Sequence, residues 1–302
     1  MVLKIGIIGL DTSHVPAFTK LLNDSEASYH ITGGQVVAAF PGGSPDFELS
    51  ISRVDGYTNE LRDKYGVHIV ESPEQVAERC DAILLESVDG RVHLEQFRRI
   101  APFGKPVFID KPFAVSSEDA RQIAKLSREH GIPVMSASAL RFAEALQDAK
   151  RVEDQGDVIG ADFYGPMALQ PTQPGLFWYG VHTVDMLYQI MGGGCVEVIA
   201  ATQEDHDVIT GFWKDGRIGT IRGNRKGNNK FGGVVHRVKR SDYIDVYANP
   251  KPYYASLLEQ VMDMFRTGQP GIDLDETVEI IRFMEAANES RSTGKRVALT
   301  VQ

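Results

Sequence analysis

Features that define several large classes of proteins are scarce or absent in this chain of 302 residues. Only two cysteines occur, Cys80 and Cys195, which is too few for a disulfide framework or a cysteine zinc site and favours a reducing compartment. No apolar run approaches the roughly 18 residues that a membrane span needs. The opening segment MVLKIGIIGL is too short and too soon interrupted for a signal peptide. These absences together predict a cytoplasmic protein.

An excess of positive charge is also absent. The formal net charge is −9 and the pI is about 5.4, so nucleic acids and anionic membranes, which would repel the chain, are not expected partners. A hydrophobic content of 42% and a charged content of 24% are typical of a globular protein, and the length suggests two domains. We therefore expect a small-molecule substrate.

The first part of the chain alternates short apolar runs with stretches of helical periodicity. This order indicates a parallel sheet covered by helices on both faces, and such sheets bind ligands at the carboxyl ends of their strands. The predicted strands are 3–8, 35–40, 82–85, 106–109 and 133–135, and the predicted helices are 17–22, 60–65, 73–79, 92–100 and 117–130.

The pattern changes near residue 140, where strands begin to follow one another with turns and no helices between them. This order is typical of an α+β domain. Its predicted strands are 160–164, 195–202, 207–213, 218–223 and 232–239, and its predicted helices are 144–153, 254–266 and 276–292. We predict an α/β protein with a Rossmann-like, doubly wound parallel sheet in residues 1–137. Residues 138–302 are predicted to form an α+β domain with a large, mostly antiparallel open sheet.

A complete glycine-rich phosphate turn is missing where one is expected, after the first predicted strand. Residues 9–15 read GLDTSHV, so Asp11 and His14 stand where a G-x-G-x-x-G turn counted from Gly9 has its second and third glycines. Two interpretations stay open. One of the polar residues caps the following helix, or the turn is a modified site whose backbone amides still bind a pyrophosphate. The candidate residues of this turn are Gly9, Leu10, Asp11, Thr12, Ser13 and His14.

The carboxylate that usually binds the adenosine ribose is missing as well. The second predicted strand ends in FPGGS, and no acidic residue follows before Asp46. Ser44 and its neighbouring glycines are candidates for binding a 2′-phosphate, with Arg53 nearby, and a plain linker is the alternative reading. NAD and NADP therefore both stay open as the cofactor. Further candidates for the cofactor site are Glu86, Ser87 and His93.

The stretch FIDKPFAVS, residues 108–116, places Lys111 just past a predicted strand, at the carboxyl edge of the sheet. A lysine at that edge can donate to a substrate hydroxyl and stabilise a developing alkoxide. Pro112 follows it, which makes a cis Lys111–Pro112 bond a possibility. The alternative is an ordinary solvated lysine.

The stretch GLFWYGVHTVD, residues 175–185, contains His182 and Asp185 three residues apart, so they share one face of a helix. A histidine titrates near neutrality and can exchange a proton with a hydroxyl, and Asp185 is a candidate to orient it. Trp178 and Tyr179 lie near the same face if the helix starts early. The alternative is a core helix in which His182 is an interior polar group. No metal site is expected.

Several of these stretches, taken in chain order, resemble one family. The chain resembles the glucose–fructose oxidoreductase and inositol dehydrogenase family (Gfo/Idh/MocA) over nearly its whole length. The resemblance implies an N-terminal Rossmann domain, a C-terminal domain with an open sheet, and an NAD- or NADP-dependent oxidoreductase acting on sugars or polyols. The similar stretches are KIGIIGL near the start, VHLEQF at 92–97, DKPFAVS at 110–116, GVHTVD at 180–185 and AANESRSTGKRVAL near the end.

The resemblance also implies roles for individual residues. Lys111 takes the place of the family's catalytic lysine and His182 that of its catalytic histidine, with Asp185 as the helix partner. The family's Asp four residues before the histidine falls on Trp178, and an indole cannot take up a proton. Tyr179 is therefore our candidate to replace that Asp, and Trp178 is expected to stack on a sugar face. Lys111 and Pro112 are also assigned to the cofactor site, and Arg141 to the substrate site.

Two other functions remain possible from the residues. The chain could be a ligand-binding or regulatory protein that keeps the fold without the cofactor, because its departures from the family lie at functional positions. It could also be a non-redox enzyme that retains NAD. The resemblance further implies a homodimer or homotetramer, and Val234, Val235 and Val238 are compatible with such an interface or with the core.

Overall fold

The computed structural model describes residues 2–152 and 154–299, which form two compact units. Segment 254–274 belongs to the first unit, although the sequence places it in the second predicted domain. The first unit comprises the described residues up to Ala114, Glu118–Ala137 and Tyr254–Leu274, and the second comprises Val115–Ser117, Ser138–Tyr253 and the described residues from Asp275 onward.

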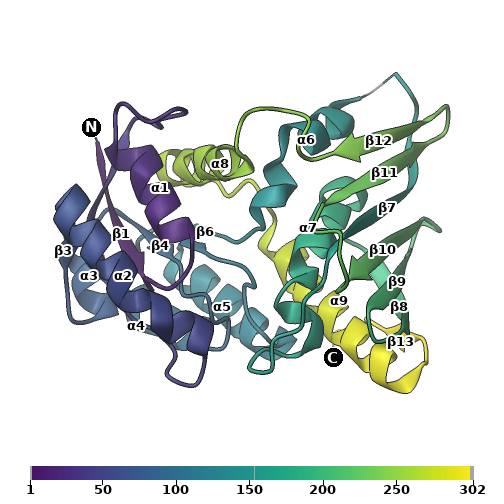
Figure 1. Ribbon diagram of the computed structural model, residues 1–302, viewed down its shortest axis with the longest axis horizontal. Helices are drawn as coiled ribbons and strands as arrows, with labels where there is room; N and C mark the ends of the chain where they lie inside the picture. Colours follow the sequence, from purple (N-terminus) through teal and green to yellow (C-terminus); the bar gives the residue numbers. More distant parts are fainter. Residues whose placement is uncertain (1, 153, 300–302) are drawn as a thin grey trace. The chain divides into compact units, whose positions relative to one another are not determined.

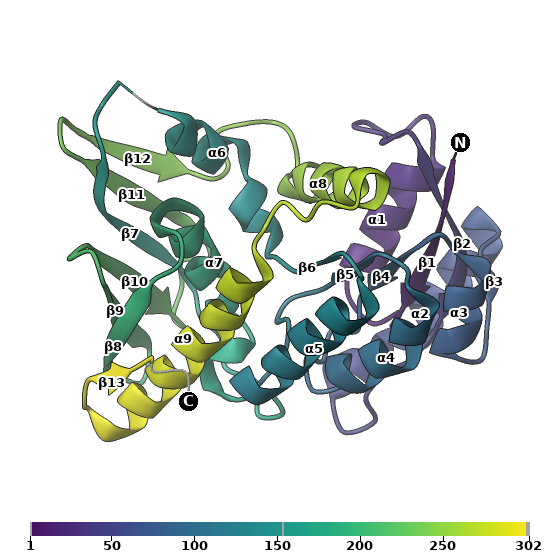
Figure 2. The ribbon, with the colours of Figure 1, turned by 180° about the vertical axis from the view of Figure 1, so that it is seen from behind.

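The first unit contains a six-stranded parallel sheet with the order β3-β2-β1-β4-β5-β6 (Figure 2). In sheets with this order, ligands bind outside the carboxyl ends of the strands where the strand order reverses, here β1 and β4. The strands are β1 (Leu3–Ile8), β2 (Gly34–Phe40), β3 (His68–Ile69), β4 (Ala82–Leu85), β5 (Val107–Ile109) and β6 (Val134–Met135). The helices of this part of the chain are α1 (His14–Asn23), α2 (Glu48–Tyr65), α3 (Pro73–Arg79), α4 (His93–Ile100), α5 (Ser117–His130) and α8 (Tyr253–Thr267), with the 3₁₀ turn η1 (Ala101–Phe103).

Helices pack on both faces of this sheet, as its apolar strands require (Figures 1 and 2). On one face, a Cβ added to Gly6 of β1 would lie 2.2 Å from Val76 of α3, so the strand and the helix are in close contact. On the other face, a Cβ added to Gly34 of β2 would lie 2.6 Å from Met262 of α8. Segment 254–274 therefore joins the first unit because α8 covers apolar strand surface there.

Elements with a clear hydrophobic pattern have the bounds that the sequence predicts. Elements with a weak pattern differ from the prediction. Strand β1 and helices α3 and α5 have the predicted bounds, whereas α2 begins at Glu48 instead of residue 60. Within α2 only Ser50, Val54 and Leu61 are buried, so its first turns carry little apolar signal. Strands β3, β12 and β13 were not predicted, because runs of two residues or an exposed edge strand show no usable periodicity.

The second unit contains a seven-stranded sheet with the order β12-β11-β7-β10-β9-β8-β13. Among the strands that the structure describes, only the β7–β10 pair of this sheet is parallel, which confirms the predicted mostly antiparallel sheet. The strands are β7 (Val158–Pro166), β8 (Cys195–Thr202), β9 (His206–Trp213), β10 (Ile218–Asn224), β11 (Gly232–Arg237), β12 (Ser241–Asp245) and β13 (Val297–Ala298). The helical segments are η2 (Ala139–Phe142), α6 (Glu144–Arg151), η3 (Gly175–Phe177), α7 (Gly180–Met191) and α9 (Leu274–Thr293).

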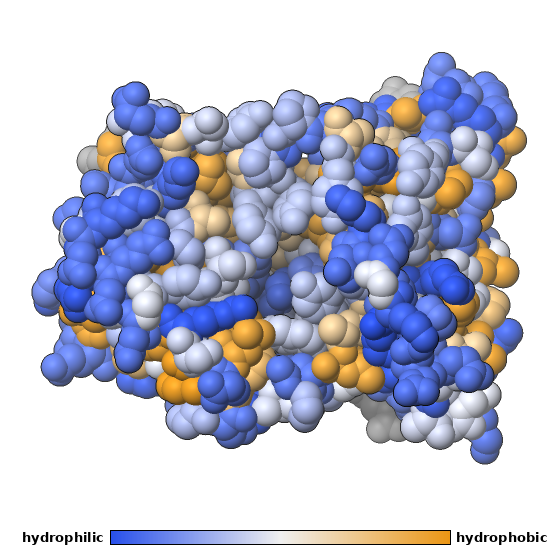
Figure 3. All heavy atoms as spheres, viewed as in Figure 1, coloured by the Kyte–Doolittle hydropathy of each residue, from blue (hydrophilic) through white to orange (hydrophobic). Residues whose placement is uncertain are grey.

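Helices α7 and α9 cover one face of this second sheet (Figure 2). Glycines in the strands let them approach, since a Cβ on Gly219 would meet Leu187 of α7 and one on Gly211 would meet Phe283 of α9. The opposite face carries the exposed apolar side chains Val208, Ile218 and Tyr243. Figure 3 shows hydrophobic and hydrophilic residues mixed on the visible surface of this unit.

None of the helices in the described ranges is both long enough and apolar enough to cross a lipid bilayer. Cys80 and Cys195 are both buried free thiols, and burial raises the pKa of each to about 12. Neither thiol is therefore a ready nucleophile near neutral pH.

Candidate active site

The turn after β1 is built around Gly9, which has a φ of 89°. A Cβ at this position would lie 2.3 Å from the Ser87 side-chain oxygen, so only glycine fits both the dihedral and the space. The chain continues beside the end of β2 for two residues, because Gly9 N donates to Phe40 O at 2.9 Å and Leu10 N donates to Pro41 O at 2.7 Å. The turn therefore begins later than a G-x-G-x-x-G turn would, and α1 starts at His14.

Asp11 is buried, and its carboxylate is bound by two other segments of the first unit. Ser50 Oγ donates to Asp11 Oδ2 at 2.5 Å, and Val88 N donates to Asp11 Oδ1 at 2.9 Å. Ser13 holds the N-cap position of α1, but its side chain makes no capping hydrogen bond. The capping interpretation is thus wrong for Asp11 and Ser13. Burial raises the pKa of Asp11 and outweighs these two hydrogen bonds, so the neutral form is favoured more than in water.

The loop after β2 is held by polar contacts of its own. Ser44 is buried, and its backbone N–H donates to Ser50 Oγ at 2.8 Å. Asp46 forms a bidentate pair with Arg91, with both N–O distances 2.8 Å, and Arg91 also contacts Asp89. The first acidic residue after β2 therefore pairs with a residue of the loop that follows β4.

His14, Glu86 and Asp110 converge at the carboxyl edge of the first sheet. They come from the start of α1 and from the positions directly after β4 and β5. His14 Nδ1 lies 3.0 Å from Asp110 Oδ2 and 3.5 Å from Glu86 Oε2, and both carboxylates are completely buried. The sequence suggested His14 and Glu86 as cofactor residues separately, but it did not predict that they would meet Asp110.

The charges in this cluster depend on one another. Burial opposes a charge on His14, but Asp110 and Glu86 outweigh it and raise the pKa of His14 to about 9. Burial and the nearby Asp110 raise the pKa of Glu86 to about 7. Burial would raise the pKa of Asp110 too, yet His14 and Lys111 hold it below its usual value. Near neutral pH, the cluster therefore favours a protonated His14 and an ionised Asp110.

Lys111 directly follows this cluster and is also buried, which excludes the ordinary solvated lysine. Its backbone N–H donates to Asp110 Oδ1 at 2.7 Å, so Asp110 fixes the backbone at the end of β5. The Lys111–Pro112 peptide bond is cis, the possibility raised by the sequence.

Ser87 and His93 join the loop after β4 to its surroundings. Ser87 Oγ donates to Gln96 Oε1 at 2.9 Å. The buried His93 ring has Nε2 at 2.7 Å from Ser87 O and Nδ1 at 3.3 Å from Phe113 O. His93 therefore connects the segment just after Glu86 with the segment just after Lys111.

His182 lies on α7 in the second unit and is held by a residue that the sequence did not suggest. Ser138 Oγ is 2.7 Å from His182 Nδ1, so this hydroxyl orients the imidazole ring. Tyr179 packs against the His182 ring edge to face at 5.2 Å between centroids, and Phe231 lies on it at 5.7 Å. The Trp178 ring lies 6.2 Å from the Tyr179 ring, so of the two aromatic residues predicted near the histidine, Tyr179 is the one in ring contact with it.

Asp185 is linked to His182 through Ser138. Ser138 N donates to Asp185 Oδ2, and Arg141 donates to Asp185 Oδ1 at 2.7 Å. Arg141 also contacts Glu276, at the start of α9, so one buried guanidinium holds two carboxylates. Burial raises the pKa of Asp185 in spite of Arg141. The predicted substrate contact of Arg141 stays a prediction, and the structure shows this guanidinium paired with Asp185 and Glu276. Glu276 belongs to no motif that the sequence revealed.

The predicted residues thus form two groups. Gly9, His14 and Lys111 belong to the first unit, and Tyr179 and His182 belong to the second. The structure shows each group by itself, and the pairing of Lys111 with His182 stays a prediction.

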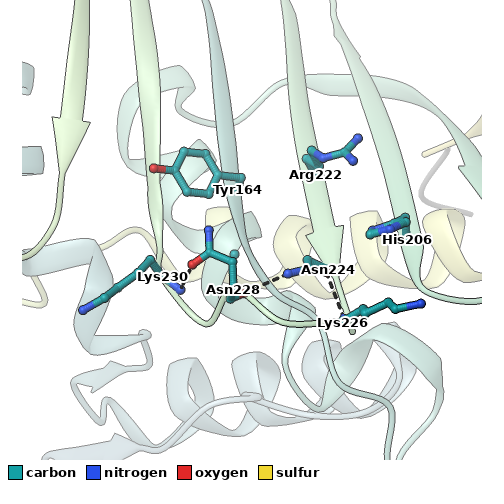
Figure 4. A pocket seen from close by; sticks show the side chains of 8 residues that line it. Tyr164, His206, Arg222, Asn224, Lys226, Asn228 and Lys230 are labelled. Carbon is teal, nitrogen blue, oxygen red and sulfur yellow. Dashed lines mark hydrogen bonds between the residues drawn. The ribbon is translucent and has the colours of Figure 1, made fainter.

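A separate recess of about 350 Å³ lies on the second sheet (Figure 4). It contains none of the predicted site residues. Lys226 is paired with Asp205 at 3.3 Å, and Lys230 lies over the Tyr247 ring at 4.2 Å, so both lysines are already engaged. The recess is lined by Tyr164, Gly165, His206, Arg222, Asn224, Lys226, Asn228 and Lys230.

The sequence of the first unit matches a known family and more distant curated proteins. Residues 3–138 match the family model described as oxidoreductase family, NAD-binding Rossmann fold (GFO_IDH_MocA). An uncharacterised oxidoreductase of Streptococcus pneumoniae is 24% identical over 150 residues, which cover 44% of this chain and 40% of that protein. A 2,7-anhydro-N-acetylneuraminate hydratase of Mediterraneibacter gnavus is 28% identical over 122 residues, covering 35% of this chain and 32% of that protein. These matches span well under half the length of either relative.

The fold of the whole chain has solved counterparts. The myo-inositol dehydrogenase of Lactobacillus casei, crystallised with NAD(H) and myo-inositol, superposes with a TM-score of 0.80 over 100% of this chain and 98% of its own. The sequence identity is 15%, so this likeness concerns the fold. It agrees with the parallel sheet and the mostly antiparallel sheet described above.

Proposed function

We propose that this chain, whose residues 3–138 belong to the Gfo/Idh/MocA oxidoreductase family with its NAD-binding Rossmann fold, is an NAD(P)-dependent oxidoreductase acting on a sugar-like or polyol substrate. The observation that carries the proposal is the Gly9 turn at the carboxyl end of β1, where the strand order of the parallel sheet reverses. Sheets of this order bind dinucleotides there.

The residues around that turn fit a dinucleotide. Gly9 permits a close backbone approach because it lacks the Cβ that would meet Ser87. Asp11, the substitution that argues most against a pyrophosphate, has both carboxylate oxygens engaged by Ser50 and Val88. The positive end of the α1 dipole also favours an anion at this turn.

The nicotinamide ring would supply the site that accepts or donates a hydride at the substrate carbon. Lys111 donates a hydrogen bond to the substrate hydroxyl and stabilises its oxyanion. His182, oriented through Nδ1 by Ser138, exchanges the hydroxyl proton of the substrate. Tyr179 replaces the acidic residue found in the family, and Trp178 stacks on the apolar face of the sugar.

The test is a fluorescence titration of ligand-free protein with NADH and NADPH. Saturable binding near or below roughly 0.1 mM, about −5.5 kcal/mol, supports the proposal and identifies the cofactor. No binding of either at millimolar concentration overturns it. A polyol screen then compares Lys111→Met with Lys125→Met, a lysine exposed on α5. We expect the first to lose activity and the second to retain it.

A second function is favoured by the name of one relative, the hydratase of Mediterraneibacter gnavus. A hydratase reaction involves no net redox change, so the chain could retain its NAD and return the hydride within one turnover. Mass spectrometry of the product with a spectrum of the bound nucleotide distinguishes the two. A redox-neutral product with no accumulated NADH supports the second function, and stoichiometric NADH excludes it.

The proposal includes an intracellular homo-oligomer. The open face of the second sheet exposes Val208, Ile218 and Tyr243, which suits a contact between copies of the chain. Of the three valines noted in the sequence, Val235 is in the core and Val238 is exposed at 65%. Sedimentation at several concentrations tests this, and a monomer throughout the range would refute it.

A further inference from the structure

The cluster of His14, Glu86 and Asp110 has the composition of a metal site. One ligand atom from each residue lies within 4.8 Å of the other two, and all three side chains are buried. Three different backbone positions supply them: the first residue of α1 and the residues after β4 and β5. They therefore meet at one point of the sheet edge because parallel strands all end there.

Glu86 is the observation that points to a missing ligand. It is completely buried, and neither carboxylate oxygen has a hydrogen-bond partner within the described residues. Asp110 Oδ2 and His14 Nδ1, which face it, also lack a hydrogen bond of good geometry. Buried polar groups are nearly always satisfied, so an unsatisfied carboxylate facing two other ligand atoms needs an explanation.

The distances suit a cation bound between these atoms. A divalent ion with bonds of about 2.0–2.1 Å to nitrogen and oxygen separates its ligands by roughly 3.0–3.4 Å. His14 Nδ1 stands 3.0 Å from Asp110 Oδ2 and 3.5 Å from Glu86 Oε2, which is close to that separation. Two carboxylates and a neutral imidazole leave the remaining coordination positions to water or to a substrate oxygen.

The composition of the site also favours a cation. Glu86 and Asp110 are both completely buried, and His14 and Lys111 stand beside them. At their formal charges, two carboxylates, a neutral imidazole and the Lys111 ammonium leave one net negative charge. A divalent ion bound between the three ligand atoms would place positive charge at that point.

We propose that His14, Glu86 and Asp110 form a binding site for a divalent transition-metal ion of the zinc class. One imidazole nitrogen and two carboxylates suit a borderline ion, and among common divalent ions the affinity of such a site rises towards copper and zinc. The proposal concerns metal binding by these three residues, two of which, His14 and Glu86, are also candidates for the cofactor site.

Zinc chloride is the probe, and the full chain is stripped with a chelator and dialysed first. Isothermal titration at pH 7.5 is expected to show one zinc ion per chain. Glu86→Gln keeps the shape of the side chain but removes a ligand charge, and we expect it to weaken zinc binding by about 100-fold or more. His14→Gln is expected to do the same. Circular dichroism checks that each variant is folded.

The matched control is His236→Gln, which removes the histidine of another His–carboxylate pair. His236 Nε2 lies 2.6 Å from Asp162 Oδ2 near the surface of the second unit. This variant is expected to bind zinc like the unmodified chain. Loss of zinc binding in His236→Gln, or unchanged binding in a folded Glu86→Gln, would overturn the proposal.

X-ray absorption of the zinc-loaded, unmodified chain provides a test that needs no variant. The proposal expects one imidazole and otherwise oxygen ligands at about 2.0–2.1 Å. A sulfur ligand, or a coordination shell with no imidazole, would overturn the proposal. A dissociation constant for zinc above about 0.1 mM would overturn it as well. Because metal binding is the readout, the result is distinct from the outcome of the NADH titration.

Discussion

Replacing Arg141 by methionine should destabilise the second unit strongly. Arg141 is buried and holds the carboxylates of Asp185 and Glu276. Methionine fills much of the same volume but leaves both carboxylates without their cation. Removing one partner of a buried ion pair costs about 3–5 kcal/mol. At about 2–4 °C per kcal/mol for a protein of 150–250 residues, we expect the melting temperature to fall by roughly 10 °C.

The loss should also depend on pH in a predictable direction. Burial already raises the pKa of Asp185 in the presence of Arg141, and removing the cation raises it further. A carboxylate whose pKa is higher in the folded than in the unfolded state opposes folding increasingly as pH rises between those two values. The stability difference between Arg141→Met and the unmodified chain should therefore be larger at pH 8 than at pH 5. Each proton involved contributes at most about 1.4 kcal/mol per pH unit.

Differential scanning calorimetry at pH 5, 6, 7 and 8 measures both effects. Arg151→Met is the control, because Arg151 forms an exposed pair with Asp148 at 3.4 Å. We expect its melting temperature to stay within experimental error of the unmodified chain at every pH. The reasoning is contradicted if Arg141→Met lowers the melting temperature by less than about 2 °C, or by the same amount at all four pH values. Either result would show that Arg141 does not stabilise the second unit through the buried charges of Asp185 and Glu276.

Three further predictions concern single residues. The pKa of His14 is raised to about 9, so protonated His14 stabilises the fold fully below about pH 6.5 and loses this contribution as pH rises to about 9. Urea titrations should therefore show the free energy of unfolding declining between about pH 7 and 9. An equal decline in His14→Gln would contradict this. Gly9→Ala places a Cβ 2.3 Å from Ser87 Oγ at a residue whose φ is 89°. We expect the free energy of unfolding, measured by chemical denaturation, to fall by about 1–3 kcal/mol. A fall of less than about 0.5 kcal/mol would show that the turn relaxes to accommodate the side chain. Ser138→Ala removes the contact to His182 Nδ1, and in the proposed oxidoreductase it should change the pH dependence of kcat while leaving the Kd for NADH unchanged; an unaltered pH profile would remove Ser138 as a positioning residue.

Much of the first unit could be predicted because its signals are local. Strand β1 is apolar apart from Lys4. Helix α5 has acidic residues in its first turn and is followed by Gly131 in the left-handed region. The position of Lys111 two residues after the end of β5 follows from the apolar run at residues 106–109. By contrast, β3 has only two residues, and the first half of α2 has too few apolar positions to show a period.

The contacts of the candidate site depended on the tertiary structure. His14, Glu86 and Asp110 are far apart in the chain and converge because their strands are parallel neighbours that end at the same edge. No spacing in the sequence could show that Asp11 binds Ser50, or that Arg141 reaches Glu276. Local periodicity and strand-end chemistry thus determined which elements form and which residues stand at their ends. Packing decided which of those residues meet, because long-range contacts between charged groups leave no periodic signal in the chain.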